Sequence, residues 1–275
     1  MADVTVIIPV RNGRDYVTFA IDSVLKQTYQ NIRLIVSDNG STDGTVEILR
    51  KLQVDNKFEL FLQDGSLSMF EHFNVCIDYV DSPYYMLLCH DDLIGNRDAI
   101  SDAMDVVKQY PKVSAIYSNM LYVDEVGEII AKKKFSQSGL FNGHEVGVDS
   151  ILSMRNQYGI PLLVSKNDLA QHRYQVDMPY VADVELSLFL SQQGPSYRID
   201  KYLIENRYHQ TNSTKGLYFG AFEQMKMLAN RYSVHLGVFS RLKMACMALL
   251  IGTAKYLFFQ YLLLRGYFRF SKASR

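Results

Sequence analysis

The sequence has few cysteines and no arrangement of them that would build a scaffold. Cys76, Cys89 and Cys246 are scattered over 275 residues, with no Cys-x-x-Cys pair and no Cys/His cluster. This argues against a disulfide framework and a structural zinc site and favours a reducing, cytoplasmic setting. Low-complexity and collagen-like stretches are also absent. The 48% of hydrophobic and 21% of charged residues are typical of a folded chain rather than a disordered one.

Acidic residues are missing from the end of the chain. The formal net charge is zero, yet the last acidic residue is Glu223, and nine Lys or Arg follow it. Residues 224–275 therefore carry +9 and residues 1–223 carry −9. An acidic body with a basic tail predicts an anionic partner for the tail, and we expect a membrane surface rather than a nucleic acid.

The first part of the chain alternates strand and helix patterns. Residues 1–3 lead directly into a β-branched run, so we expect no signal peptide. Strands are expected at 4–10, 32–36, 58–62, 84–89 and 113–117, and helices at 16–25, 46–52, 68–79 and 97–109. This alternation predicts an open α/β sheet that binds its ligand beyond the carboxyl ends of the strands.

The pattern becomes irregular after about residue 120. A hairpin is expected over 122–134, short segments at 160–164, 184–191, 197–199 and 202–207, and a polar loop at 210–216. The residues after this loop have a helical pattern and become increasingly apolar. We therefore expect a catalytic domain over 1–215, divided into 1–118 and 119–215, and a helical extension over 216–275.

Acidic residues follow two of the expected strands. Asp91 and Asp92 end a buried strand, where two crowded carboxylates call for a cation or a shared proton. The alternative is a solvated turn in which Asp92 caps the next helix. Asp38 could accept hydrogen bonds from a nucleotide, or it could simply form the turn before Asn39-Gly40.

Two further candidates lie in the irregular region. Asp183 begins a helical pattern, where it could cap the helix or act as a general base for an acceptor hydroxyl. His209 stands between a strand and the polar loop. A lone histidine of this kind is usually structural, but imidazole is also a common ligand of divalent metals.

Three motifs taken together resemble the inverting family-2 glycosyltransferases of GT-A fold. They are Val6-Ile7-Ile8-Pro9-Val10-Arg11-Asn12-Gly13, Gln27-Thr28-Tyr29, and Ile35-Val36-Ser37-Asp38-Asn39-Gly40-Ser41-Thr42-Asp43-Gly44-Thr45, of which residues 36–45 are especially specific. The resemblance covers about residues 4–215. It implies a Rossmann-like open mixed sheet flanked by helices, followed here by the helical, apolar and basic tail.

The resemblance also implies roles for individual residues. The nucleotide sugar would be bound by Pro9, Val10, Arg11, Asn12, Asp38, Asp91 and Arg207. Asp91 and His209 would hold a divalent cation, Mn²⁺ or Mg²⁺, on the diphosphate, with Ser213 matching the motif that contains the histidine. Asp183 would be the catalytic base.

This sequence departs from the family pattern at two positions. Cys89 stands where the first aspartate of the Asp-x-Asp motif is common, and Ala182 replaces the glutamate that usually precedes the base. The first departure weakens the metal assignment, although Asp91 keeps the position that faces the metal.

The implied reaction moves a sugar from a nucleoside-diphosphate sugar to a hydroxyl of a glycan or lipid-linked glycan, with inversion. UDP is the first expectation for the nucleotide, with GDP and dTDP as alternatives. Two other interpretations compete: a non-catalytic sugar-nucleotide-binding or scaffolding protein, which the two departures motivate, and a nucleotidyltransferase. The second would need a Gly-rich basic phosphate loop, which Arg11-Asn12-Gly13-Arg14 does not convincingly supply.

The tail contains a 21-residue stretch, 244–264, whose only charge is Lys255. By length it could cross a bilayer, but basic residues flank it on both sides. We therefore favour a helix that lies in the plane of the inner face of the membrane, over a spanning helix or a plain packing contact.

Overall fold

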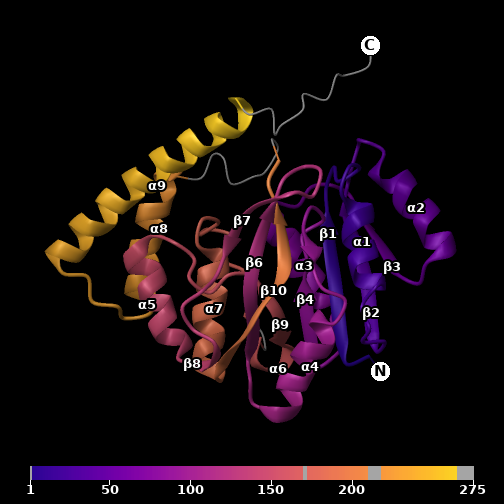
Figure 1. Ribbon diagram of the computed structural model, residues 1–275, viewed down its shortest axis with the longest axis horizontal. Helices are drawn as coiled ribbons and strands as arrows, with labels where there is room; N and C mark the ends of the chain where they lie inside the picture. Colours follow the sequence, from indigo (N-terminus) through magenta and orange to yellow (C-terminus); the bar gives the residue numbers. More distant parts are fainter. Residues whose placement is uncertain (1, 170–171, 210–217, 265–275) are drawn as a thin grey trace.

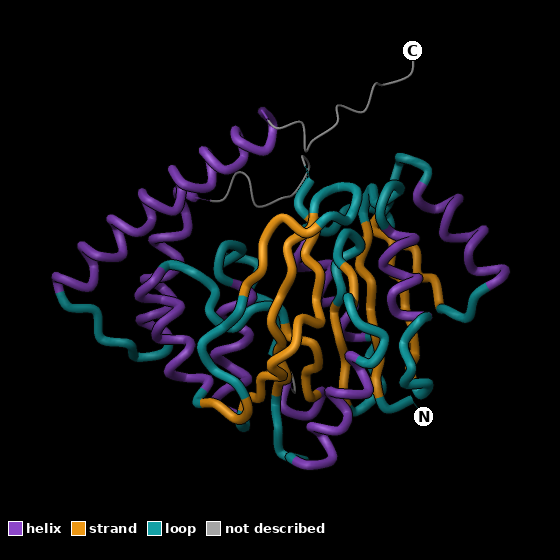
Figure 2. The backbone as a smooth tube through the Cα atoms, viewed as in Figure 1, coloured by secondary structure: helices purple, strands orange, loops and turns teal. Residues whose placement is uncertain are grey.

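One mixed β-sheet runs through the part of the chain that the computed structural model describes, residues 2–169, 172–209 and 218–264 (Figure 1, Figure 2). The strands lie in the order β3-β2-β1-β4-β9-β6-β10-β5, with β7 paired to β6 and β8 to β10. Their bounds are β1 Val4–Val10, β2 Ile32–Asn39, β3 Glu59–Gln63, β4 Tyr84–Leu87, β5 Leu93–Ile94, β6 Ala115–Val123, β7 Ile129–Lys133, β8 Gly139–Phe141, β9 Pro161–Ser165 and β10 Ser196–Arg207. The sheet confirms the expected α/β class.

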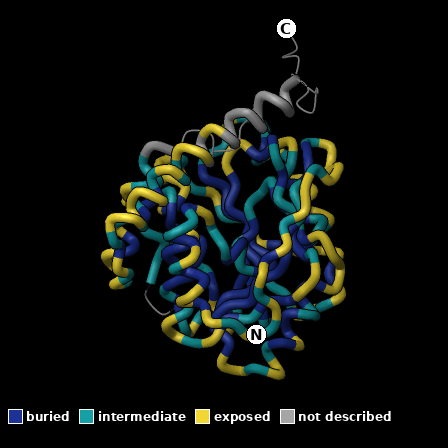
Figure 3. Tube along the Cα trace, turned by 60° about the vertical axis from the view of Figure 1, so that its left-hand side comes forward, coloured by how far each residue is buried: buried dark blue, intermediate teal, exposed yellow. Residues whose placement is uncertain are grey.

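Helices cover both faces of this sheet. They are α1 Val17–Leu25, α2 Thr45–Asp55, α3 Met69–Asp78, α4 Ala99–Gln109, α5 Gly143–Ser153, α6 Lys166–Leu169, α7 Ala182–Gln193, α8 Tyr218–Arg231 and α9 Val238–Leu264. One hydrophobic core lies under α1, α2 and α4, and a second lies under α3 and α5 to α9. In Figure 3 the buried segments gather along the strands between these two layers.

Strand β1 shows why the sheet forms at this place. All seven of its residues are buried, and it pairs in parallel with β2 on one side and β4 on the other. Val4, Val6 and Ile8 enter one core, whereas Ile7 enters the other. An apolar run that is covered on both faces is typical of a parallel strand within an α/β sheet.

The structure corrects the irregular region in one place. The segments expected at 197–199 and 202–207 form one strand, β10, whose pairing with β6 shifts register between Ile199 and Ile204. The helical pattern expected from Asp183 onward is confirmed as helix α7. The hairpin over 122–134 is confirmed as β6 and β7. Helix α5 and strand β8 have no counterpart among the expected elements.

The predicted helical tail appears as α8 and α9. Figure 1 shows α9 on the outer side of α8 and α5, away from the sheet. Among the described residues no helix combines the length and the apolar character needed to cross a membrane. The polar loop at 210–216, Ser213 and the basic residues from 265 onward lie outside the described residues.

Candidate active site

The loops after β1 and β2 are bound to each other at the carboxyl edge of the sheet. Asn12, with a positive φ of 52°, donates its backbone N–H to Ser41 Oγ at 2.7 Å. Its side-chain oxygen accepts from the backbone N–H of Thr42 at 2.9 Å. Arg11 is exposed, whereas Pro9 and Val10 are buried at the end of β1. The two predicted nucleotide-binding loops are thus one connected surface.

Asp38 carries an oxygen that lacks a donor within the described chain. The residue is only 1% exposed, and its Oδ1 accepts from the backbone N–H of Ser41 at 2.9 Å. Oδ2 has no hydrogen-bond partner among the described residues. An unsatisfied buried oxygen costs about 1–3 kcal/mol. Asp38 can therefore accept a hydrogen bond from a ligand, as its predicted role requires.

Asp91 and His209 lie in contact although 118 residues separate them. Nε2 of His209 is 2.9 Å from Oδ2 of Asp91, and both side chains are largely buried. Burial by itself would raise the pKa of Asp91. The hydrogen bond with His209 and the nearby imidazoles of His90 and His209 outweigh burial and lower that pKa below its ordinary value. The structure therefore brings together the two predicted metal ligands and favours the ionised carboxylate.

Asp92 is not the solvated helix cap of the alternative interpretation. It is buried, and its carboxylate accepts from the Asn206 side chain at 3.0 and 3.1 Å and from the Arg207 backbone at 3.0 Å. Helix α4 is instead preceded by Asp98 as its N-cap residue. Burial, followed by the charge of Asp91, raises the pKa of Asp92 well above its ordinary value. Asp92 therefore binds β10 to the end of β4.

Arg207 occupies the base of the same region. Its guanidinium donates to the backbone carbonyls of Asp91, Asp124 and Glu125 at 2.9–3.2 Å. It also lies over the ring of Tyr16, at 5.3 Å from the centroid. These contacts hold the Asp91 backbone in place. A contact between Arg207 and the nucleotide sugar stays a prediction.

The first position of the Asp-x-Asp motif contributes a thiol. Ligand atoms of Cys89, Asp91 and Asp92 lie within 4.8 Å of one another, a spacing that could hold a metal ion. Burial, with the charges of Asp92 and Asp91, raises the pKa of the Cys89 thiol well above its ordinary value.

His90 packs against Gly13, where an added Cβ would lie 2.5 Å from the imidazole. Larger residues are therefore excluded at Gly13.

Asp183 lies in the first turn of α7 and is exposed as a residue. Its Oδ1 accepts from the backbone N–H of Val184 at 2.8 Å, and its Oδ2 accepts from the Asn156 side chain at 2.6 Å. The N-cap residue of α7 is Val181, so Asp183 is not the N-cap. Although the residue is exposed, the protein atoms packed around its carboxylate raise its pKa above the ordinary value, and the hydrogen bond from Asn156 opposes this shift. A carboxylate with a raised pKa that solvent can reach suits a proton acceptor.

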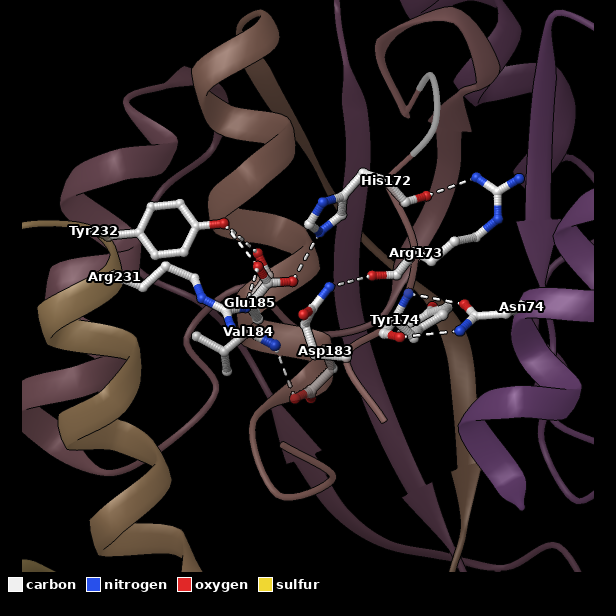
Figure 4. Close-up of polar contacts among 10 residues, drawn as sticks. Asn74, His172, Arg173, Tyr174, Asp183, Val184, Glu185, Arg231 and Tyr232 are labelled. Carbon is white, nitrogen blue, oxygen red and sulfur yellow. Dashed lines mark hydrogen bonds and ion pairs between the residues drawn. The ribbon is translucent and has the colours of Figure 1, made fainter. Parts of the chain in front are cut away.

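Some functional-site residues were not predicted from the sequence. Asn156 and Tyr174 lie in segments without a recognisable pattern. The backbone of Tyr174 pairs with the side chain of Asn74 on α3 through two hydrogen bonds, at 2.8 and 3.0 Å (Figure 4). Burial first, and then charges that include Cys89 and Asp183, raise the pKa of Tyr174.

The comparison with family models settles the class of the protein. The glycosyl transferase family 2 model matches residues 5–163, which is more than half of the chain. The chain belongs to glycosyltransferase family 2, and the resemblance inferred from the motifs is confirmed. The matched segment contains the loops after β1 and β2 and Asp91, but neither Asp183 nor His209.

Curated relatives agree with this family. An uncharacterized glycosyltransferase of Haemophilus influenzae is 27% identical over 78% of this chain and 87% of its own length. An uncharacterized glycosyltransferase of Rickettsia conorii is 26% identical over 77% of this chain. The match covers only 35% of that longer protein.

Solved structures share the fold. TarS of S. aureus in complex with UDP-GlcNAc is 16% identical, with a TM-score of 0.69 over 88% of this chain and 69% of that one. The mannosyltransferase PcManGT of Pyrobaculum calidifontis, in complex with GDP-Man and Mn²⁺, is 13% identical, with a TM-score of 0.60 over 96% of this chain and 81% of that one. These similarities support the GT-A fold.

Proposed function

We propose that the protein is an inverting, metal-dependent hexosyltransferase. It would use a nucleoside-diphosphate sugar, with UDP as the first expectation, and a hydroxyl of a glycan or lipid-linked glycan as acceptor. The contact between Asp91 and His209 is the observation that carries this proposal. It joins the end of β4 to the segment after β10, beside the loops that hold Asp38.

The donor would lie on the carboxyl edge of the sheet. Pro9, Val10, Arg11 and Asn12 would border the nucleotide, and the buried, unsatisfied Oδ2 of Asp38 would accept a hydrogen bond from it. Asp91 and His209, a carboxylate and an imidazole, fit a divalent cation such as Mn²⁺ or Mg²⁺. When bound, such a cation stabilises the charge that develops on the nucleoside-diphosphate leaving group.

Asp183 would act on the acceptor. An acceptor hydroxyl attacks the anomeric carbon from the face opposite the leaving group, and its proton passes to the Asp183 carboxylate. The bond to the nucleoside diphosphate breaks in the same displacement, so the anomeric configuration inverts. The raised pKa of Asp183 suits this role because a stronger base takes the proton more readily.

A second candidate function is a binding protein that has lost catalysis. The thiol of Cys89 and the missing carboxylate at Ala182 favour it. Thermal shifts with UDP-GlcNAc and GDP-mannose, each with and without Mn²⁺, together with release of the free nucleotide, distinguish the two. Metal-dependent stabilisation with release of UDP or GDP supports a transferase, whereas stabilisation without release supports the binder. If no sugar nucleotide of a wider panel stabilises the protein or is cleaved, both candidate functions are contradicted.

We also propose that α9 binds the cytoplasmic face of an anionic membrane. Phe239, Leu242 and Leu249 recur at helical spacing and are 58–89% exposed, and Arg241 and Lys243 lie exposed beside them. Met244, on another side of the helix, is fully buried against the body. Apolar side chains with flanking basic residues suit the headgroup region.

Flotation with phosphatidylglycerol vesicles tests this surface in the full chain. A double variant, Leu242→Ser with Leu249→Ser, should lose most of the binding. Val54→Ser on α2 is the matched control, since Val54 is also exposed, at 83%. Equal flotation of both variants would contradict a role for α9. High salt should weaken binding without abolishing it, because the apolar contact remains.

A further inference from the structure

Glu185 is a buried carboxylate that the proposed reaction does not use. It lies in the first turn of α7, two residues after Asp183, and is 0% exposed. Three side chains contact it: His172 Nε2 at 2.9 Å, the Tyr232 hydroxyl at 3.0 Å and the Arg231 guanidinium at 3.4 Å (Figure 4). A charge buried so deeply persists only where partners compensate for the lost hydration.

Helix α8 supplies most of these contacts. Arg231 and Tyr232 lie at its carboxyl end, and Gln224 accepts from the backbone N–H of Tyr180 at 2.8 Å. Gly220 faces the ring of Tyr180, where an added Cβ would lie 2.3 Å away. Positions 220, 224 and 231 are four and seven residues apart, which places them on one face of the helix. This face of α8 therefore covers the segment from Tyr180 to Glu185.

The start of α7 has one local side-chain bond among the described residues, from the backbone N–H of Val184 to Asp183 Oδ1 at 2.8 Å. The N-cap residue of this helix, Val181, makes no side-chain capping bond. A helix end without a side-chain cap is easily displaced unless tertiary contacts hold it. The contacts of Glu185 and Tyr180 with α8 therefore hold the turn that carries Asp183.

We propose that Glu185, Arg231 and Tyr232 position the catalytic base, so that the catalytic unit extends through α8 to residue 232. The division predicted at residue 215 would leave these partners outside it. The inference rests on the proposed function of Asp183. A displacement of the base by about 1 Å can lower the rate about a hundredfold. Donor binding should change little, because its proposed residues lie on other elements.

Two full-chain variants and one control test this inference. Tyr232→Phe removes one hydroxyl without a change of charge, and Glu185→Gln keeps the size of the side chain. Glu223→Gln is the control, because Glu223 lies on the outside of α8 and pairs only with Lys226 in the described structure. UDP release from UDP-GlcNAc with Mn²⁺ and water as acceptor gives kcat and KM. Hydrogen exchange of the amides at 182–187 reports on the turn without any donor.

We expect kcat to fall about tenfold in Tyr232→Phe and further in Glu185→Gln, with KM for the donor within about twofold of wild type. Exchange at 182–187 should become faster in both variants and stay unchanged in Glu223→Gln. Lower thermal stability with unchanged kcat, or unchanged exchange, would overturn the inference. Asp183→Asn in the same assay separates the proposed base from the proposed positioning role. Full activity of Asp183→Asn refutes Asp183 as the base. Loss of activity in Asp183→Asn together with normal activity in Tyr232→Phe refutes only the positioning role. If UDP-GlcNAc is not turned over, kcat and KM are measured with GDP-mannose or another sugar nucleotide that the protein does turn over.

Discussion

The two ends of the candidate site treat their carboxylates in opposite ways. At the Asp91 end, hydrogen bonding and imidazole neighbours lower the pKa in spite of burial. At the Asp183 end, the surrounding protein raises the pKa, and hydrogen bonds from Asn156 and the Val184 backbone, with the charge of Lys133, oppose this shift only in part. A metal ligand must be ionised, whereas a base must be able to hold a proton after it has taken one. The two environments therefore suit the proposed roles, in which Asp91 acts on the sugar-nucleotide donor and Asp183 on the acceptor hydroxyl.

The largest expected effect concerns the Asp91 end. Asp91→Ala should abolish Mn²⁺-dependent binding of the sugar nucleotide, because it removes the proposed ionised ligand and its hydrogen bond with His209. Calorimetry with UDP-GlcNAc, with and without Mn²⁺, measures this. Asp105→Ala, at an exposed ion pair on α4, is the control. Unchanged Mn²⁺-dependent affinity in Asp91→Ala would remove the metal assignment.

The second-largest effect is expected from Asp183 and should concern turnover rather than donor binding. Asp183→Asn keeps the shape of the side chain but cannot take a proton, so turnover should fall at least about a hundredfold while donor affinity stays close to wild type. Steady-state release of UDP, combined with calorimetry, separates the two quantities. Wild-type turnover would show that Asp183 serves only the local structure of α7.

A smaller effect is expected from the thiol at the metal end. Cys89→Asp adds a hard oxygen ligand in place of a soft sulfur, which should favour Mg²⁺ over Cd²⁺ by roughly tenfold. Without metal the variant should melt at a lower temperature, because three carboxylates then crowd one site. Metal titrations followed by donor binding and by thermal melting check both effects. An unchanged order of metals would place Cys89 outside the ligand set.

The smallest effect tests the pKa of the base directly. The charge of Lys133 lowers the pKa of Asp183, and Lys133 Nζ donates to the backbone oxygen of Asn156 at 2.8 Å. Lys133→Met should therefore raise this pKa further. Because the active form is deprotonated, the acid limb of the kcat profile should move to higher pH, by less than about one unit. Lys132→Met is the matched control, since Lys132 is the adjacent residue of β7 and lies over Tyr202 instead. A shift in the opposite direction would contradict the role of Asp183.

Local patterns were sufficient to predict the strands and helices of the first part of the chain. The strands β1 and β2 and the polar loops after them follow from runs of buried residues and turn-forming residues that are contiguous in sequence. The capping box at Ser68 and Glu71 likewise marks the start of α3. Such signals depend on neighbours within a few residues, so the sequence exposes them.

The sequence by itself therefore determined the class of sheet, the family and the identity of the aspartates that are available for chemistry. The family resemblance already implied that Asp91 and His209 share a cation, and the structure adds their direct contact. Only the tertiary structure paired Asn156 with Asp183 and Tyr232 with Glu185. These pairs are 118, 27 and 47 residues apart and follow no period along the chain. Contacts of this kind are set by strand order and helix packing, because a long-range pair forms only where the whole fold brings its two segments together.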